Sequence, residues 1–289
     1  MQTFTASGLA LVIAAASLIG SGCRKPDPAP EELDDIVHFG FSRYAADSDD
    51  LNDRTLADAA ENLTLWWDEN DQGAELFTAV DDTELRDEDL ATLDPPNSAS
   101  DAGALFGVMV GRVTDCTLDD IDRLYFIDDQ HGLFPDNYVG YTRTRTSDFD
   151  CFLEDDGCEE ITWNADVVQE TNVIGTIVTR EFTLGSGLRR VSAIPADPAE
   201  TTPGEVQARF SRTWMLDPAV MSPVIANSDF RQNYQLEIMT PYDGGIIHFY
   251  GMWTDLRSDL NTEAPIFING YVDGLAETLD ALEEHCQGG

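Results

Sequence analysis

The sequence predicts an α+β fold: a curved antiparallel sheet of about six to eight strands gripping a long C-terminal helix, with short helices ahead of the sheet. Between residues 138 and 256, polar and apolar residues alternate with a period of two, and β-branched and aromatic residues dominate. From about Asn269 to His285, apolar residues recur at steps of three and four, the spacing of one helix face. That stripe must pack on an apolar surface, which the sheet provides.

The chain begins with a segment typical of an export signal. Residues 9–19 (LALVIAAASLI) form an uncharged, mainly apolar run, but they are fewer than the roughly 20 residues that a helix needs to cross a bilayer. The run ends at Gly20-Ser21-Gly22-Cys23, and a polar, proline-rich stretch follows. This resembles a bacterial lipobox, although Gly20 stands where Leu is usual and no basic residue precedes the run. We expect residues 1–22 to be a lipoprotein signal peptide and Cys23 to carry the lipid; the alternative is an ordinary secretory signal that leaves a free Cys23.

The expected anchor divides the chain into a tether and one domain. Acylation at Cys23 would hold the protein on a membrane, because two or more acyl chains anchor stably where one is marginal. No Asp follows Cys23 directly, and by resemblance to other lipoproteins this indicates an outer-membrane protein facing the periplasm or the cell surface. Residues 23–37 are predicted to be a disordered tether, and residues 38–289 a single domain.

Helices are predicted first along the domain. Residues 55–67 have helical spacing, with Thr55 and Asp58 in the positions of a capping box. Residues 104–113 predict a buried strand, and Thr117 caps a short helix directly after it. The strand candidates that follow lie near residues 138–146, 160–168, 173–183, 188–194, 205–215, 233–240 and 246–255.

Three glycine-containing segments are predicted to be turns. Gly185-Ser186-Gly187 is expected to separate two strands, and Asp243-Gly244-Gly245 to form a hairpin, because these residues tolerate positive φ. The segment from Asp68 to Gly73 begins like a calcium loop, but Gln72 is a poor ligand and Ala79 stands where a bidentate Glu is needed. It therefore indicates a helix end followed by a turn.

The cysteines predict two disulfides. Besides Cys23 the chain has four, and an even number in an exported chain favours disulfide pairs, with three possible pairings. Cys151 and Cys158 flank a short acidic loop that closes easily, which leaves Cys116 to pair with Cys286.

Charge and motif content exclude several functions. The net charge is −39, and nucleic-acid binding needs a basic patch that this chain does not offer. The acidity is typical of solubility in a salty or divalent-rich medium. The four histidines lie in separate elements without metal-ligand spacing, and neither a nucleophile elbow nor a phosphate-binding glycine loop occurs. We therefore predict no catalytic residue, no metal site and no cofactor.

The order of elements resembles the START-like, helix-grip superfamily (SRPBCC). Residues 244–286 (GGIIHFYGMWTDLRSDLNTEAPIFINGYVDGLAETLDALEEHC) are similar to its closing pattern of hairpin strand, short loop with Pro, and leucine-bearing helix. Residues 179–182 (TREF) resemble one of its strand segments, and residues 112–117 (RVTDCT) its first strand-to-helix junction. A β-sandwich or a lipocalin-like barrel with a trailing helix is the alternative fold, and it explains the early helices less well.

The resemblance implies a cavity between the sheet and the last helix that takes a lipid or other hydrophobic small molecule. An arginine among apolar walls would there orient a carboxylate or another polar headgroup. Candidate lining residues share faces of three predicted strands: Tyr141, Arg143 and Arg145; Phe210, Arg212 and Trp214; Phe249 and Trp253.

Three other interpretations remain at this point. The aromatic residues can simply fill a solid core. The fold also includes enzymes, and a cyclase or hydrolase would have to draw on His248, Arg143, Arg145 or Asp255. A surface interaction module would have no cavity at all.

Overall fold

The computed structural model describes residues 29–45, 50–73, 75–80, 83–135, 137–153, 158–173, 175–193, 206–260 and 265–287. The expected signal peptide, Cys23 and the first part of the expected tether lie outside these residues.

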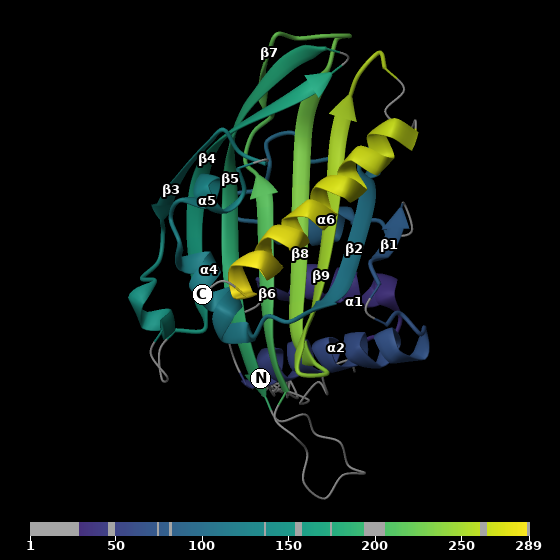
Figure 1. Ribbon diagram of the computed structural model, residues 1–289, viewed down its shortest axis with the longest axis vertical. Coiled ribbons are helices and arrows are strands. Elements are labelled where there is room, and N and C mark those ends of the chain that lie inside the picture. Colours follow the sequence, from purple (N-terminus) through teal and green to yellow (C-terminus); the bar gives the residue numbers. More distant parts are fainter. Residues whose placement is uncertain are drawn as a thin grey trace, which may run out of the picture.

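In the described part of the chain, nine antiparallel strands form one sheet (Figure 1). Their order is β1-β2-β9-β8-β6-β5-β4-β3, with β7 paired to β5. The strands are β1 (Phe77–Val80), β2 (Phe106–Thr114), β3 (Gly140–Arg145), β4 (Glu160–Val173), β5 (Thr176–Ala193), β6 (Val206–Met215), β7 (Val220–Ser222), β8 (Asp229–Tyr242) and β9 (Gly245–Arg257). The predicted α+β class and the antiparallel sheet are confirmed, and the short strands β1 and β7 are additions to the prediction.

One of the two predicted strand turns is confirmed and the other is wrong. Asp243 and Gly244 have φ values of 47° and 87° and join β8 to β9, with Tyr242 paired to Gly245. Gly185-Ser186-Gly187, in contrast, lies inside the single long strand β5. A Cβ on Gly185 would lie 2.7 Å from the Trp214 ring, so this glycine allows close packing and does not make a turn.

One face of the sheet, called the α2 face below, is covered by α1 (Leu33–Arg43), α2 (Asp50–Glu69), α3 (Asp87–Leu90) and η1 (Ala102–Ala104). Figure 1 shows α1 and α2 behind the strands. The tether prediction is wrong from Leu33 onward, because Ile36 and Val37 are fully buried in this layer. Thr55 lies inside α2 and does not cap it, since the helix begins five residues earlier. The predicted helix end after Asp68 is confirmed.

The opposite face, called the α6 face, carries α4 (Leu118–Phe126), α5 (Gln130–Leu133), η2 (Asp150–Leu153) and α6 (Pro265–Gln287). The long helix α6 crosses the sheet diagonally (Figure 1), and its Leu275, Leu279 and Leu282 are buried against the layer below. Thr117 caps α4 as predicted, because its hydroxyl accepts a hydrogen bond from the backbone N–H of Asp120. The gripping C-terminal helix is therefore confirmed.

Covalent and ionic links hold α4 and α6 in place. Both predicted disulfides are present: Cys116–Cys286 joins the segment before α4 to the end of α6, and Cys151–Cys158 closes the short loop. Arg209 makes two hydrogen bonds of 2.7 Å to the buried Asp122 of α4. The C-terminal end of α6 is thus fixed relative to the sheet.

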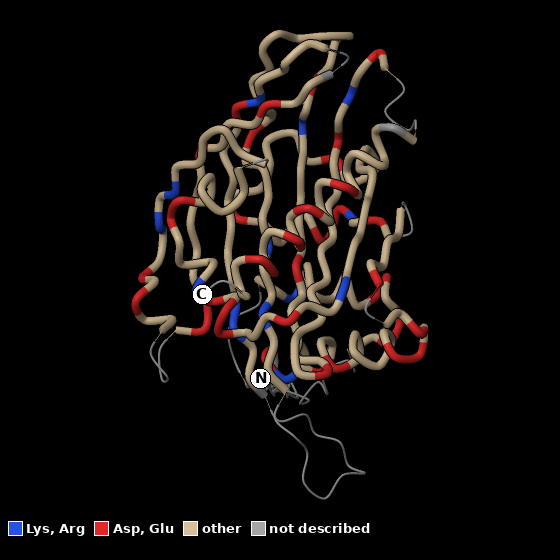
Figure 2. The backbone as a smooth tube through the Cα atoms, in the orientation of Figure 1, with Lys and Arg blue, Asp and Glu red and all other residues tan. Residues whose placement is uncertain are grey.

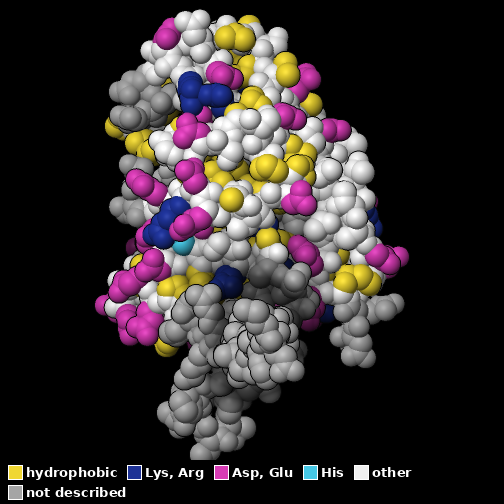
Figure 3. Space-filling view, turned by 180° about the vertical axis from the view of Figure 1, so that it is seen from behind, with side chains coloured by type: hydrophobic (Ala, Val, Ile, Leu, Met, Phe, Trp, Pro, Cys, Tyr) yellow, Lys and Arg dark blue, Asp and Glu magenta, His cyan; other side chains and the backbone are white. Residues whose placement is uncertain are grey.

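Acidic residues are spread along most elements, with few basic residues between them (Figure 2). The face turned away from the viewer in Figure 1 has the same scatter (Figure 3). The negative charge is therefore distributed over the surface and does not mark one site.

Candidate ligand-binding site

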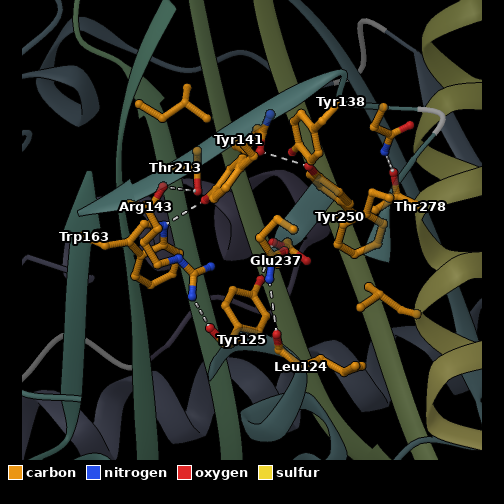
Figure 4. Close-up of a pocket in the computed structure, with 17 residues that line it drawn as sticks. Leu124, Tyr125, Tyr138, Tyr141, Arg143, Trp163, Thr213, Glu237, Tyr250 and Thr278 are labelled. Atoms are coloured by element: carbon orange, nitrogen blue, oxygen red, sulfur yellow. Dashed lines mark hydrogen bonds between the residues drawn. The ribbon is translucent and has the colours of Figure 1, made fainter. Parts of the chain in front are cut away.

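A cavity lies between the α6 face of the sheet and the helices α4, α5 and α6 (Figure 4). Its inner part has a volume of about 90 Å³. Strands β5, β6, β8 and β9 form the floor, because every second residue of a strand points to the same face. The lining residues used below are Tyr125, Tyr138, Tyr141, Arg143, Trp163, Ser186, Thr213, Gln235, Glu237 and Tyr250.

The floor is polar. Ser186, Thr213 and Gln235 lie in register on β5, β6 and β8. The Thr213 hydroxyl donates to Ser186 at 3.1 Å, and the Tyr250 hydroxyl donates to Gln235 Oε1 at 2.9 Å. A row of hydrogen-bonding groups therefore crosses the sheet where a purely hydrophobic cavity would have aliphatic side chains.

The walls are aromatic. The ring of Tyr125 meets that of Trp163 at a centroid distance of 6.0 Å, and the rings of Tyr138 and Tyr141 lie 5.3 Å apart. The indole N–H of Trp163 donates to the Tyr141 hydroxyl at 3.1 Å. These contacts fix the rings around the chamber, so the space is preformed.

Glu237 is the acidic group of the inner chamber. Its Oε1 accepts a hydrogen bond from the Tyr125 hydroxyl at 2.5 Å, and its Oε2 lies 2.8 Å from Nε2 of the buried His248. Burial, and then the negative charge of Glu237, raise the pKa of Tyr125 well above its usual value near 10. The same two causes, in the same order, raise the pKa of Tyr250. Both phenols are therefore neutral hydrogen-bond donors at physiological pH.

Arg143 is the basic group of the inner chamber, and its contacts are internal. Its guanidinium lies over the Trp163 ring at 4.6 Å and donates to the backbone carbonyl of Tyr125. Asp128 lies 3.8 Å from the same side chain, which is only 1% exposed. Asp128 thus offsets the charge of this cation, while its buried Nε has no hydrogen-bond partner in the described part of the chain.

The cavity continues outward as a groove of about 380 Å³ beneath the N-terminal half of α6. Its lining is mixed, with Phe182, Leu184, Phe230 and Met252 among the apolar members. Two glycines of α6, Gly270 and Gly274, also line it. A hydrogen bond of 2.8 Å from Asn137 to Thr278 lies where the groove meets the inner chamber, since both residues line both parts.

A scan against protein-family models and a search of curated proteins found no match. A search of solved structures found similar chains. A STAR-related lipid transfer protein from Xanthomonas axonopodis has 11% identity and a TM-score of 0.40, over 65% of this chain and 96% of that one. A START superfamily protein from Mycobacterium smegmatis has 13% identity and a TM-score of 0.33, over 63% and 97%. A di-domain ARO/CYC protein from the steffimycin biosynthetic pathway has 10% identity and a TM-score of 0.33, over 63% and 51%.

The likeness lies in the fold.

Only two of the eight predicted lining residues face the cavity, Tyr141 and Arg143. Arg145 shares their strand but lies outside, where it pairs with Asp128 at 3.0 Å. The other five point to the α2 face, and the prediction that they line a cavity beneath the C-terminal helix is wrong: Phe210, Arg212, Trp214, Phe249 and Trp253.

The contacts of these residues on the α2 face explain the correction. Arg212 donates to the carbonyl of Phe41 in α1 at 2.9 Å, and the Trp253 indole N–H donates to the carbonyl of Thr83 at 2.8 Å. The period-two pattern grouped each set correctly on one face. It could not say which face, because helices cover both.

Floor residues that were not predicted lie on the predicted strands. Thr213 lies between Arg212 and Trp214, and its small polar side chain on the other face of the strand was the available signal. Glu237 lies at the centre of a predicted strand, where a carboxylate needs a buried partner.

The four candidates for an enzymatic site are not brought together. His248 contacts Glu237, and Arg143 lines the chamber, but Arg145 lies outside it. Asp255 lies on the α2 side, where it accepts a hydrogen bond from Gln232 at 3.3 Å.

Two further findings concern the described residues alone. No three His, Cys, Asp or Glu side chains among them are grouped as metal ligands would be. Within the same part of the chain, none of the helices combines the length and the apolar character that crossing a membrane requires.

Proposed function

We propose that this protein binds one small, mainly hydrophobic molecule in the cavity beneath α6, and that it carries this molecule without converting it. The observation that supports the proposal is a preformed chamber with aromatic walls, open to a larger groove with apolar members. A groove of about 380 Å³ falls in the volume range of small-molecule sites, and its lining mixes apolar and polar side chains. A solid core would leave no such space between the sheet and α6.

Gly274 offers a direct test. A Cβ built on this residue meets no atom within 4 Å, and the residue lines the groove. The Cβ of either substitution therefore has space; we expect the ring of Gly274→Phe to occupy the groove, whereas Gly274→Ala leaves it open. The alanine also favours the helix, by roughly 0.5–1 kcal/mol.

Binding is measured with the neutral fluorescent probe N-phenyl-1-naphthylamine. We expect the wild type and Gly274→Ala to bind it equally, and Gly274→Phe to bind it at least about tenfold more weakly, a loss of about 1.4 kcal/mol. Equal binding by Gly274→Phe, with its fold intact by circular dichroism, would refute the cavity as the site. Organic extraction of the purified wild type, followed by mass spectrometry, identifies any molecule retained from the cell.

We also propose that the protein acts while held at a bacterial outer membrane by acyl chains on Cys23. The apolar run ending at Cys23 supports this. Asn62 of α2 donates to the carbonyls of Ala29 and Pro30 at 3.2 and 2.9 Å. The segment from Cys23 to Ala29 reaches at most about 20 Å, so such an anchor would keep the domain close to the membrane.

Metabolic labelling with an alkyne analogue of palmitate tests the anchor. We expect label on the wild type, recovery in the outer-membrane fraction, and loss of both in Cys23→Ser. An unlabelled wild type would show that the segment is an ordinary secretory signal.

A further inference from the structure

We propose that the ligand of this cavity carries a hydroxyl or amine group whose hydrogen Glu237 accepts, so that an alcohol, phenol or amine binds in preference to a carboxylate or an ether. The inference rests on the proposed binding function and names the chemistry of the polar end of the ligand. It replaces the expectation that an arginine orients a carboxylate.

Glu237 is placed and held for this role. It lies on the floor of the inner chamber, with a side chain that is 11% exposed. Tyr125 and His248 hold the two carboxylate oxygens from within the protein. An ionised carboxylate has about four acceptor positions, so two of them remain for a ligand.

Neighbouring groups also leave acceptor positions open. The hydroxyl protons of Tyr125, Tyr250 and Thr213 are already donated to protein oxygens. Gln235 Oε1 accepts one bond and has a second lone pair. A ligand that brings its own hydrogen satisfies these atoms, whereas an ether leaves them unpaired, at a cost typical of buried polar groups.

The charge of the chamber disfavours an anionic ligand. Within the inner chamber Arg143 is the cation that could receive one. Asp128 lies beside it, its Nη1 donates to the Tyr125 carbonyl and the Trp163 ring packs on its plane, while its buried Nε has no hydrogen-bond partner among the described residues. The other arginine of the cavity, Arg180, lines the outer groove and not the chamber. In the described part of the chain Glu237 pairs with Tyr125 and His248 and not with an arginine or lysine. Its charge acts across the chamber on the phenols of Tyr125 and Tyr250. A ligand carboxylate in this space would meet a like charge in surroundings of low dielectric constant.

The volumes assign the polar end and the body of the ligand to different parts of the cavity. A cavity of about 150 Å³ holds a benzene molecule, so the inner chamber of about 90 Å³ admits only a small group. The groove of about 380 Å³ is left for the apolar body. The ligand therefore enters with its donor group first.

Three ligands with the same ring system test this inference: 1-naphthol, 1-methoxynaphthalene and 1-naphthoate, each displacing N-phenyl-1-naphthylamine at pH 7. The ether is at least as apolar as the naphthol, so the hydrophobic effect alone does not favour the naphthol. For the wild type we expect 1-naphthol to bind about tenfold more tightly than the ether, and the carboxylate to bind most weakly.

Glu237→Gln keeps the shape of the side chain and removes its charge. We expect this variant to bind 1-naphthoate about tenfold better relative to 1-naphthol than the wild type does. Glu84→Gln changes an exposed carboxylate outside the cavity lining and is expected to leave the wild-type ratios unchanged. If Glu237→Gln does not fold, the wild-type ratios decide alone.

The possible outcomes separate the two proposals. If none of the ligands or the probe binds, or if Gly274→Phe binds them all as the wild type does, the proposed function fails. If they bind in the cavity but the ether or the carboxylate equals 1-naphthol, the binding function stands and the inference about Glu237 is overturned.

Discussion

The disulfide between Cys116 and Cys286 should contribute more to stability than any other single link in the described fold. It joins residues 170 positions apart, whereas Cys151–Cys158 closes a loop of only 7. In the chain-entropy model the stabilisation grows with the logarithm of the loop length, which gives about 5 kcal/mol for the long loop and about 2 kcal/mol for the short one. The double variant Cys116→Ala/Cys286→Ala should therefore lose about 5 kcal/mol of unfolding free energy.

Packing adds a smaller loss at the same site. Cys116 is 1% exposed, so its replacement by Ala leaves a small void that costs about 1 kcal/mol more. The C-terminal end of α6 also loses its covalent attachment, and the groove beneath the helix should then exchange amide hydrogens faster.

Urea titration measures the effect, with linear extrapolation of the unfolding free energy. Each variant is made in a Cys23→Ser background so that this thiol cannot exchange with the disulfides. The matched control is Cys151→Ala/Cys158→Ala, for which we expect a loss of about 2 kcal/mol. If the two double variants lose the same free energy, loop length does not determine the contribution of these disulfides, and the reasoning fails.

Three further predictions follow from burial. Asp122→Asn should lower the unfolding free energy by about 3–5 kcal/mol, because it removes the carboxylate that pairs with the buried Arg209. Asp119→Asn, on the exposed side of the same helix, should change the unfolding free energy by less than about 0.5 kcal/mol in the same urea assay. Burial raises the pKa of Tyr125 and Tyr250 above 10, so as the pH rises the unfolded chain loses these protons before the folded protein does. The unfolding free energy should therefore be unaffected below pH 10 and fall as the pH rises beyond it. The phenolate absorbance of these tyrosines should appear only with unfolding. Phe210→Leu should lower the unfolding free energy by about 1 kcal/mol and leave probe affinity unchanged, since this ring packs on the α2 face; a change in affinity would place it at the cavity after all.

Local patterns in the sequence predicted much of the architecture. The hairpin at Asp243 depends on residues that tolerate positive φ, and the stripe of α6 depends on the spacing of its leucines. The pairing of Cys116 with Cys286 followed from the easy closure of the other two cysteines. The turn and the helix depend on residues that are close in the chain, and the long-range disulfide follows from the number of cysteines that remain. No tertiary contact was needed to predict these features.

The helix α1 shows where local patterns fail. Its segment is acidic and follows a proline-rich stretch, so the composition indicated a tether. Ile36, Val37 and Phe41 nevertheless form a buried face against the sheet. Packing on a partner surface stabilises a helix that the composition of its own segment does not predict.

The sequence by itself determined which residues share a face of each strand, where the last helix lies and which cysteines pair. Only the tertiary structure decided that Phe210 and Trp253 face α2 while Thr213 and Glu237 face the cavity. Alternation along a strand has a period of two and is the same whichever side is called the inside. With helices on both sides of this sheet, the choice is made by long-range packing, and the location of the binding site depends on that choice.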